Sequence, residues 1–71
     1  MSKLTDAELD LYFVVKGSGG NFKTKLFELI CASDICNQEL LKRAFPDFVE
    51  VVIKYKNEAG YWTQVQERYN D

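Results

Sequence analysis

The amino-acid sequence predicts an all-α fold, a compact bundle of four short helices with a last helical segment after Gly60. Two observations lead to this prediction. Apolar residues recur every three to four positions along most of the chain, and capping, glycine and proline signals fall between these periodic stretches. The chain has 71 residues, of which 46% are apolar and 28% charged. A chain of this length forms a single domain, residues 1–71, with a thin hydrophobic core.

The first helix is predicted over residues 5–16. Thr5 and Glu8 have capping-box spacing, in which the threonine hydroxyl accepts from the Glu8 amide while the Glu8 carboxylate reaches back to the cap. The apolar run 11–15 is also typical of a strand, but the cap and the polar Asp10 favour a helix.

Three further helices follow, over residues 22–32, 36–45 and 47–58. Ser33 and Asp34 interrupt the apolar pattern between the first two of them. Proline lacks an amide hydrogen and clashes with a preceding helical turn, so the proline at position 46 ends one helix and fits the first turn of the next.

The last third of the chain has two interpretations. With helical period its apolar residues form one stripe, whereas with period two residues 49–55 and 61–69 become the strands of a hairpin around a turn at 57–60. Behind two short helices, such a hairpin would make an α+β winged helix. The alternation places Val52 and Trp62 on the face that should be polar, and the helical stripe leaves fewer misplaced residues. We therefore predict helices here and keep the hairpin as the alternative.

The helical pattern also predicts which side chains form the hydrophobic core. The predicted core residues are Leu9, Phe13, Leu26, Phe27, Ile30, Leu40, Leu41, Phe45, Val49, Val52 and Ile53.

The composition argues against catalysis and metal binding. Histidine is absent, so neither a Ser-His-Asp nor a Cys-His arrangement is available, and the acidic residues are spread singly along polar faces. Cys31 and Cys36 alone cannot supply the four ligands of a structural zinc site, and we expect both as reduced thiols. We predict that the protein is not an enzyme and takes no cofactor or metal.

The charge balance and hydropathy bear on partners and location. The chain has nine basic and eleven acidic residues, and its net charge is −2. This balance indicates neither a polycationic nucleic-acid-binding protein nor an acidic tail. No apolar run approaches the roughly 20 residues of a membrane helix, and the first residues lack the apolar stretch of a signal peptide. We expect a cytoplasmic protein without a membrane partner.

Residues 17–24, GSGGNFKT, partly match the phosphate-binding loop pattern G-x-x-x-x-G-K-[ST]. The match fails at Phe22, where the pattern requires a glycine so that the backbone can wrap the phosphates. A simpler anion site stays open, in which the first amides of helix 22–32 act together with Lys23 and Lys25. We expect a short link followed by a helix.

Aromatic residues give the strongest indication of function. Ten of the 71 residues are aromatic, more than a thin core hides, and Tyr55, Tyr61, Trp62 and Tyr69 gather near the C-terminus. Tyrosine and tryptophan combine a large contact area with a polar group and are enriched in interface hot spots. We predict a non-catalytic protein-interaction module that docks through this aromatic C-terminal face. Its partner is another protein or a second copy of the chain, as in a homo-oligomer.

DNA binding is the alternative function. Helices 22–32 and 36–45, joined by a tight turn, are compatible with a helix-turn-helix, and a C-terminal hairpin would add a wing. The overall acidity and the absence of a basic stripe argue against this alternative. The residues that would contact nucleic acid are Gln38, Lys42 and Arg43 on the second helix, and Lys54 and Lys56 on the wing.

A pattern of spaced residues covers about half of the chain and consists of Phe27, Ile30, Ser33, Asp34, Asn37, Leu40, Phe45, Pro46, Val49, Tyr55, Gly60, Tyr61 and Trp62. The pattern is loosely similar to small uncharacterised helical proteins of phages and other mobile elements. This resemblance contains no catalytic motif and transfers no site residue. It implies a compact helical domain of unknown activity that binds a host or phage protein.

Overall fold

The computed structural model describes residues 3–70, and every regular element in that range is a helix. The all-α prediction is therefore confirmed, and the winged-helix alternative is wrong because residues 49–55 and 61–69 form no strands. The count of four helices is one too low, since the segment after Gly60 is a full helix of ten residues. The helices are α1 (Asp6–Lys16), α2 (Asn21–Ala32), α3 (Ile35–Ala44), α4 (Pro46–Asn57) and α5 (Tyr61–Asn70).

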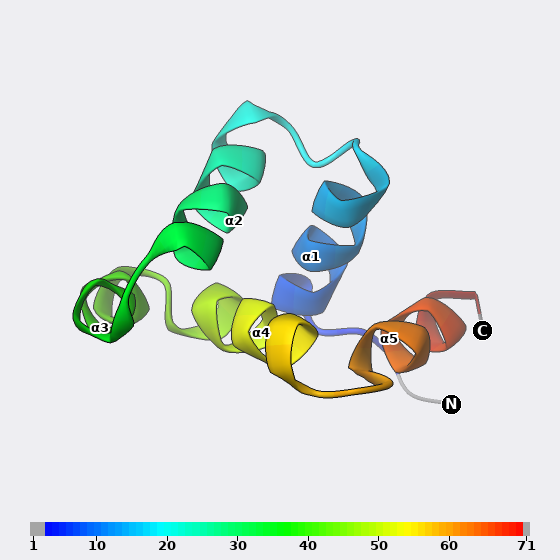
Figure 1. Ribbon diagram of the computed structural model, residues 1–71. Helices are drawn as coiled ribbons and strands as arrows, with labels where there is room; N and C mark the ends of the chain where they lie inside the picture. The colour runs from blue at the N-terminus through cyan, green and yellow to red at the C-terminus, as the bar shows by residue number, and fades with distance from the viewer. Residues whose placement is uncertain (1–2, 71) are drawn as a thin grey trace.

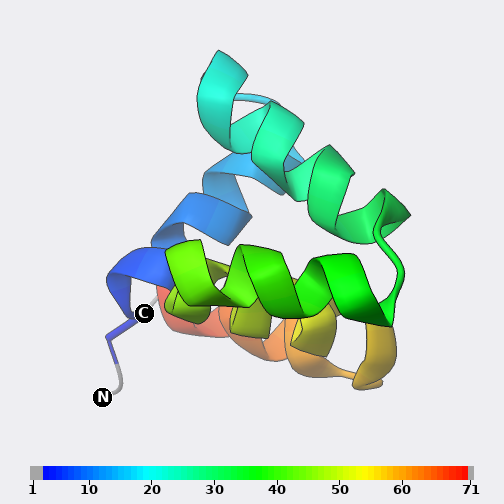
Figure 2. The ribbon, with the colours of Figure 1, turned by 90° about the vertical axis from the view of Figure 1, so that its left-hand side faces the viewer.

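Helix α4 is the centre of the bundle, because it packs against each of the other four helices. Figure 1 shows α1 and α2 side by side above α4, with α3 at one end of the molecule and α5 at the other. Figure 2 shows α3 running alongside α4, while α2 crosses above it. The molecule is accordingly elongated, with principal extents of 36 × 24 × 17 Å.

Local signals set the helix boundaries. The capping box at the start of α1 forms as predicted: the Glu8 amide donates to Thr5 Oγ1 at 3.2 Å, and the Thr5 amide donates to Glu8 Oε1 at 3.0 Å. Gly17 ends α1 in the left-handed conformation, with φ at 92°. The Asp34 side chain caps α3 by accepting from the Asn37 amide at 2.8 Å.

The hydrophobic core lies where α1, α2, α4 and α5 meet. Four of the predicted core residues are buried, namely Leu26, Ile30, Val49 and Val52. Four more are half-buried and pack against the core, namely Phe27, Leu41, Phe45 and Ile53. Leu9 is also half-buried. The buried side chains that the prediction missed are Ala7, Leu11, Val14, Phe48, Val51, Tyr61 and Val65.

Two predicted core residues are wrong, because Phe13 is 37% and Leu40 is 58% exposed. In α1 the uninterrupted apolar run allows two helical phases, and the helix turns Leu11 and Val14 inward, which leaves Phe13 outside. In α3 no residue is buried, since this helix packs mainly on α4 and Leu40 lies away from that contact. Within residues 3–70, no helix has both the length and the apolar character needed to cross a membrane.

Candidate functional site

Aromatic rings from four helices form a continuous row along one side of the bundle. Tyr55 of α4 meets Trp62 of α5 edge to face, with ring centroids 5.5 Å apart, and Trp62 lies 5.8 Å from Tyr12 of α1. Tyr12 in turn stacks on Tyr69, with centroids 4.0 Å apart and planes 17° from parallel. Phe27 of α2 extends the row from Tyr55, at 5.8 Å. The row joins α5 to the rest of the bundle.

Only one end of this row is open to solvent. Tyr69 is 41% and Phe13 is 37% exposed, and their rings meet edge to face at 5.8 Å. Tyr12, Trp62 and Tyr55 are half-buried behind them. We call Tyr12, Phe13, Trp62 and Tyr69 the aromatic surface, which lies on the seam between α1 and α5.

The predicted aromatic face is therefore only partly assembled. Trp62 and Tyr69 belong to the aromatic surface and Tyr55 supports it, but Tyr61 is buried and lies apart from it. Sequence analysis missed Tyr12 and Phe13, since they precede Trp62 by about fifty positions and only tertiary packing brings them there.

Tyr61 belongs to a buried polar cluster at the start of α1. Its hydroxyl donates to Glu8 Oε2 at 2.8 Å, and Arg68 donates to the same carboxylate through Nη2 at 2.8 Å and Nη1 at 3.1 Å. Arg68 Nη2 also donates to the Lys3 carbonyl at 3.1 Å, while Arg68 Nε is buried with no hydrogen-bond partner in the described part of the chain. These contacts attach α5 to the first turn of α1.

The cluster keeps the Glu8 carboxylate charged. Burial by itself would raise the pKa of Glu8, but hydrogen bonds from Thr5, Tyr61 and Arg68, together with the guanidinium charge, hold this pKa below its ordinary value. Burial and the adjacent carboxylate raise the pKa of Tyr61 well above its ordinary value. Glu8 is therefore an ionised carboxylate whose two oxygens are already engaged.

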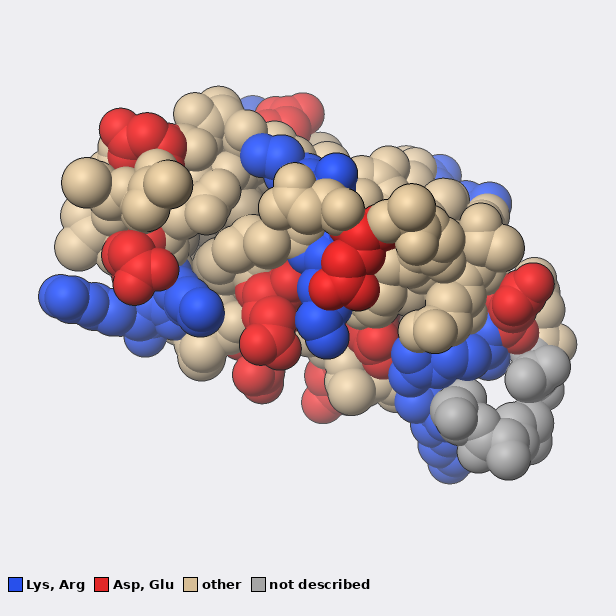
Figure 3. All heavy atoms as spheres, turned by 60° about the horizontal axis from the view of Figure 1, so that its bottom comes forward, with Lys and Arg blue, Asp and Glu red and all other residues tan. Residues whose placement is uncertain are grey.

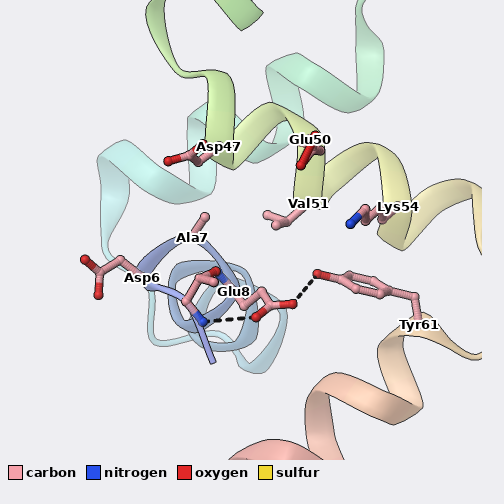
Figure 4. Close-up of a pocket in the computed structure, with 9 residues that line it drawn as sticks. Asp6, Ala7, Glu8, Asp47, Glu50, Val51, Lys54 and Tyr61 are labelled. Carbon is pink, nitrogen blue, oxygen red and sulfur yellow. Dashed lines mark hydrogen bonds between the residues drawn. The ribbon is translucent and has the colours of Figure 1, made fainter. Parts of the chain in front are cut away.

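A pocket of about 400 Å³ opens between the start of α1 and α4, beside this cluster. Figure 4 shows Glu8 and Tyr61 pointing toward each other at one side of it, with Glu50 and Lys54 across from them on α4. On the side of the molecule that Figure 3 shows, acidic side chains gather near the middle, with basic ones among them. Within residues 3–70, no three Asp, Glu or Cys side chains are grouped to hold a metal ion. The pocket lining is mainly acidic among its charged residues, and the Glu8 carboxylate at one side of it is already engaged in structural hydrogen bonds.

The residues of the DNA-binding alternative are spread over two helices. Lys42 and Arg43 are exposed on α3, while Gln38 is half-buried. The placement of Lys54 and Lys56 on a wing is wrong, because both lie on α4, where residues 46–57 are helical. Lys54 Nζ sits 5.8 Å from the Tyr61 ring centroid, and Lys56 Nζ donates to the Cys31 carbonyl at 3.3 Å. DNA binding through Gln38, Lys42 and Arg43 stays a prediction.

The anion-binding alternative at the start of α2 and the two cysteines can now be placed in the structure. Lys23, one of the two lysines of the anion alternative, is paired with Asp10 Oδ2 at 2.6 Å and lies over the Phe48 ring. Lys25 is exposed. Cys31 and Cys36 are free thiols, and burial raises the pKa of Cys31.

Comparisons with known proteins gave no match: no family model, no curated protein and no solved structure resembles this chain.

Proposed function

We propose that this chain is a non-catalytic protein-interaction module that docks a partner protein through the aromatic surface. The exposed Phe13–Tyr69 pair is the observation that supports this proposal most directly. Its two rings come from different helices and both pack on Tyr12, which in turn packs on Trp62, so they are held in place before a partner arrives. Rigid aromatic side chains lose little conformational freedom on binding, which is why they serve as interface anchors.

The state of Glu8 supports a non-catalytic role. A general acid or base works best when its pKa lies near the working pH and when a proton-transfer partner can reach it. Glu8 has a lowered pKa, and Thr5, Tyr61 and Arg68 occupy both of its oxygens. The free thiols of Cys31 and Cys36 are in keeping with the reducing cytoplasm, where we propose that the protein acts.

Affinity capture from a lysate of the producing cells, with nuclease added and the eluate identified by mass spectrometry, tests the proposal. Wild-type protein is expected to retain a discrete protein that Phe13→Ala and Tyr69→Ala each reduce about tenfold, the effect of losing one interface anchor. Ile35→Ala is the matched control, because Ile35 is 79% exposed and lies on α3, outside the aromatic surface.

Two results would overturn the proposal. One is capture that is insensitive to both aromatic substitutions while circular dichroism shows the helices intact. The other is a bound fraction that consists of nucleic acid and of proteins lost on nuclease treatment. A second copy of the chain as partner would appear as a dimer in sedimentation that Tyr69→Ala dissociates.

A further inference from the structure

The row of aromatic rings that crosses α2, α4, α5 and α1 carries polar groups as well as apolar faces. Its rings are those of Phe27, Tyr55, Trp62, Tyr12, Tyr69 and Phe13. Within residues 3–70, none of the three tyrosine hydroxyls in this row takes part in a hydrogen bond, and neither does the indole nitrogen of Trp62. The Tyr61 hydroxyl, which lies outside the row, is by contrast bound to Glu8.

The polar atoms of the row reach solvent although most of its rings are half-buried. Among the described residues that are not exposed, the one buried side-chain nitrogen or oxygen without a hydrogen-bond partner is Arg68 Nε. The half-buried residues Tyr12, Tyr55 and Trp62 therefore keep their polar atoms at the surface. Each of these side chains has an apolar body packed in the row and a polar tip in water.

Gln66 adds a further polar group at the same place. It follows Trp62 by four positions and precedes Tyr69 by three, so it lies between them on one face of α5. Gln66 is half-buried, and its amide makes no hydrogen bond within the described residues and reaches solvent by the same argument. Phenol, indole and amide groups can all donate a hydrogen bond. The row thus presents several donors beside its rings.

These donors restrict what can cover the row. A ligand that packs on the rings also removes water from the polar tips. A donor that is covered and left without an acceptor costs roughly a factor of ten or more in affinity. The occupant must therefore offer flat apolar groups for the rings and free acceptors for the donors at the same time.

The backbone of the ligand decides whether such acceptors are available. An α-helix uses its carbonyls in its own hydrogen bonds except in its last turn. An added strand needs the edge of a sheet, and the described part of this chain has helices as its only regular elements. A polyproline II segment makes no internal hydrogen bonds, so its carbonyls are free, and its proline rings are flat and apolar. Only this backbone supplies both groups.

Charge does not select the occupant, because charges of both signs lie beside the row. Lys16 Nζ lies 5.6 Å from the Tyr12 ring centroid, while the exposed Glu58 follows Tyr55 by three positions at the end of α4. The hydrogen-bonding groups and the rings therefore determine which ligand fits.

We propose that the aromatic row binds a proline-rich segment of the partner protein in the polyproline II conformation. Its prolines pack on the exposed rings of Phe13 and Tyr69, and its carbonyls accept from the polar tips farther along the row. This inference rests on the proposed function and names the class of segment that docks. A second copy of this chain is not the occupant, because its single proline, Pro46, lies in the first turn of α4.

A random library of displayed peptides of about 12 residues, selected on the folded protein, tests this proposal. Such a peptide is roughly 37 Å long as polyproline II, comparable with the longest extent of the molecule, 36 Å. Selected peptides are expected to carry prolines three positions apart, the repeat of this conformation. Their affinity should fall about fivefold in Tyr12→Phe and in Tyr55→Phe, since each variant keeps the ring and removes one donor.

Tyr61→Phe is the matched control. It removes the same atom, but from a buried hydroxyl that is bound to Glu8 and lies outside the row, so peptide affinity should stay as in wild type. A second measurement follows the one tryptophan directly. In the labelled protein, the indole N–H resonance of Trp62 should shift on peptide binding, whereas the amide of Ile35 on α3 should not.

Three outcomes would overturn the proposal. They are a library that yields no binder, selected peptides without spaced prolines, and proline-rich peptides that bind wild type, Tyr12→Phe and Tyr55→Phe alike. Peptides with apolar residues at positions i, i+3 or i+4, and i+7 would show that the occupant is a helix instead. Circular dichroism of each variant checks that the helices are intact.

The same selection separates this inference from the proposed function. If the selected peptides lack proline but lose their affinity in Phe13→Ala and Tyr69→Ala, the polyproline II inference fails and the aromatic surface remains the docking site. If the selected peptides bind every aromatic variant as they bind wild type, the docking surface itself is wrong, and both proposals fail.

Discussion

The Tyr61 hydroxyl donates to Glu8 Oε2 at 2.8 Å across 53 positions of sequence. Glu8 is at the same time the carboxylate of the capping box that begins α1. One side chain thus completes a local helix cap and anchors a distant helix, since Arg68 of α5 binds the same carboxylate. This one charged group therefore ties the first turn of α1 to Tyr61 and Arg68 of α5.

Removing the Tyr61 hydroxyl tests how much its hydrogen bond to Glu8 contributes to the free energy of unfolding. Tyr61→Phe keeps the buried ring but leaves Glu8 with one donor fewer, and we expect the free energy of unfolding to fall by about 1–2 kcal/mol. Glu8→Gln should be more damaging, by about 2–3 kcal/mol, because Arg68 is then left half-buried without its counter-charge. Urea unfolding followed by circular dichroism measures both values.

A matched control keeps the first prediction specific. Tyr69→Phe removes a hydroxyl from an exposed tyrosine on the same helix and should change the free energy of unfolding by less than about 0.5 kcal/mol. Equal effects at positions 61 and 69 would contradict the role assigned to the buried cluster.

The lowered pKa of Glu8 predicts the direction of the pH dependence. The folded protein holds this pKa below its ordinary value of 4.5, so the unfolded chain binds the proton more readily. The resulting stabilisation is fully present above the unfolded pKa and is lost as the pH falls through the folded one. We therefore expect the thermal midpoint to drop on acidification below about pH 4.5.

Glu8→Gln should reduce the fall of the thermal midpoint at low pH, because the neutral amide does not titrate. Glu67→Gln, at an exposed position on α5, should leave this fall as in wild type. Thermal denaturation between about pH 3.5 and pH 7 measures the midpoint of each variant and of the wild type. If the midpoint of Glu8→Gln fell with acidification as steeply as that of the wild type, the prediction would be refuted.

The capping box shows what sequence reasoning could and could not predict. Thr5 and Glu8 were identified from their spacing, since a cap depends on residues within one turn. The other partners of Glu8 were not identified, because Tyr61 and Arg68 reach it only through tertiary packing. Helix boundaries follow from such local signals, and for this reason the sequence predicts four of the helices with their approximate bounds and the fifth only as a helical segment after Gly60.

The hydrophobic core shows a second limit of prediction from the sequence. Five consecutive apolar residues in α1 give no unique helical phase, and the choice between Leu11 and Phe13 as the inward residue depends on which face meets α4. Leu40 satisfied the apolar pattern but lies in a groove between α2 and α3. An apolar stripe identifies a surface that something covers, and the pattern alone does not say whether that cover lies within the same chain.

Gly19 is required where the link after α1 packs against that helix. A Cβ at this position would lie 2.5 Å from Val14 Cγ2 and 2.8 Å from Val14 Cα, and a backbone atom cannot move aside without shifting α1. We expect Gly19→Ala to lower the free energy of unfolding by about 2–3 kcal/mol. Gly17→Ala is the control: its Cβ meets open space, and the left-handed backbone at this position, with φ at 92°, accounts for an expected loss of about 1 kcal/mol. Urea unfolding measures the free energy of unfolding of the two variants. Equal losses in both would contradict the close packing of Gly19 against Val14.

Within the aromatic surface, Trp62 is half-buried and supports the exposed rings of Phe13 and Tyr69 through Tyr12. Its ring lies between Tyr55 and Tyr12, so Trp62→Ala removes contacts to both α4 and α1. We expect a loss of about 2–3 kcal/mol in the free energy of unfolding, in addition to any effect on partner binding. Tyr69→Ala, which removes one stacked and half-exposed ring, should lose about 1 kcal/mol. If Trp62→Ala left stability unchanged in urea unfolding, the row would not be what joins α5 to the bundle, and Trp62 would itself be the better candidate for the docking residue.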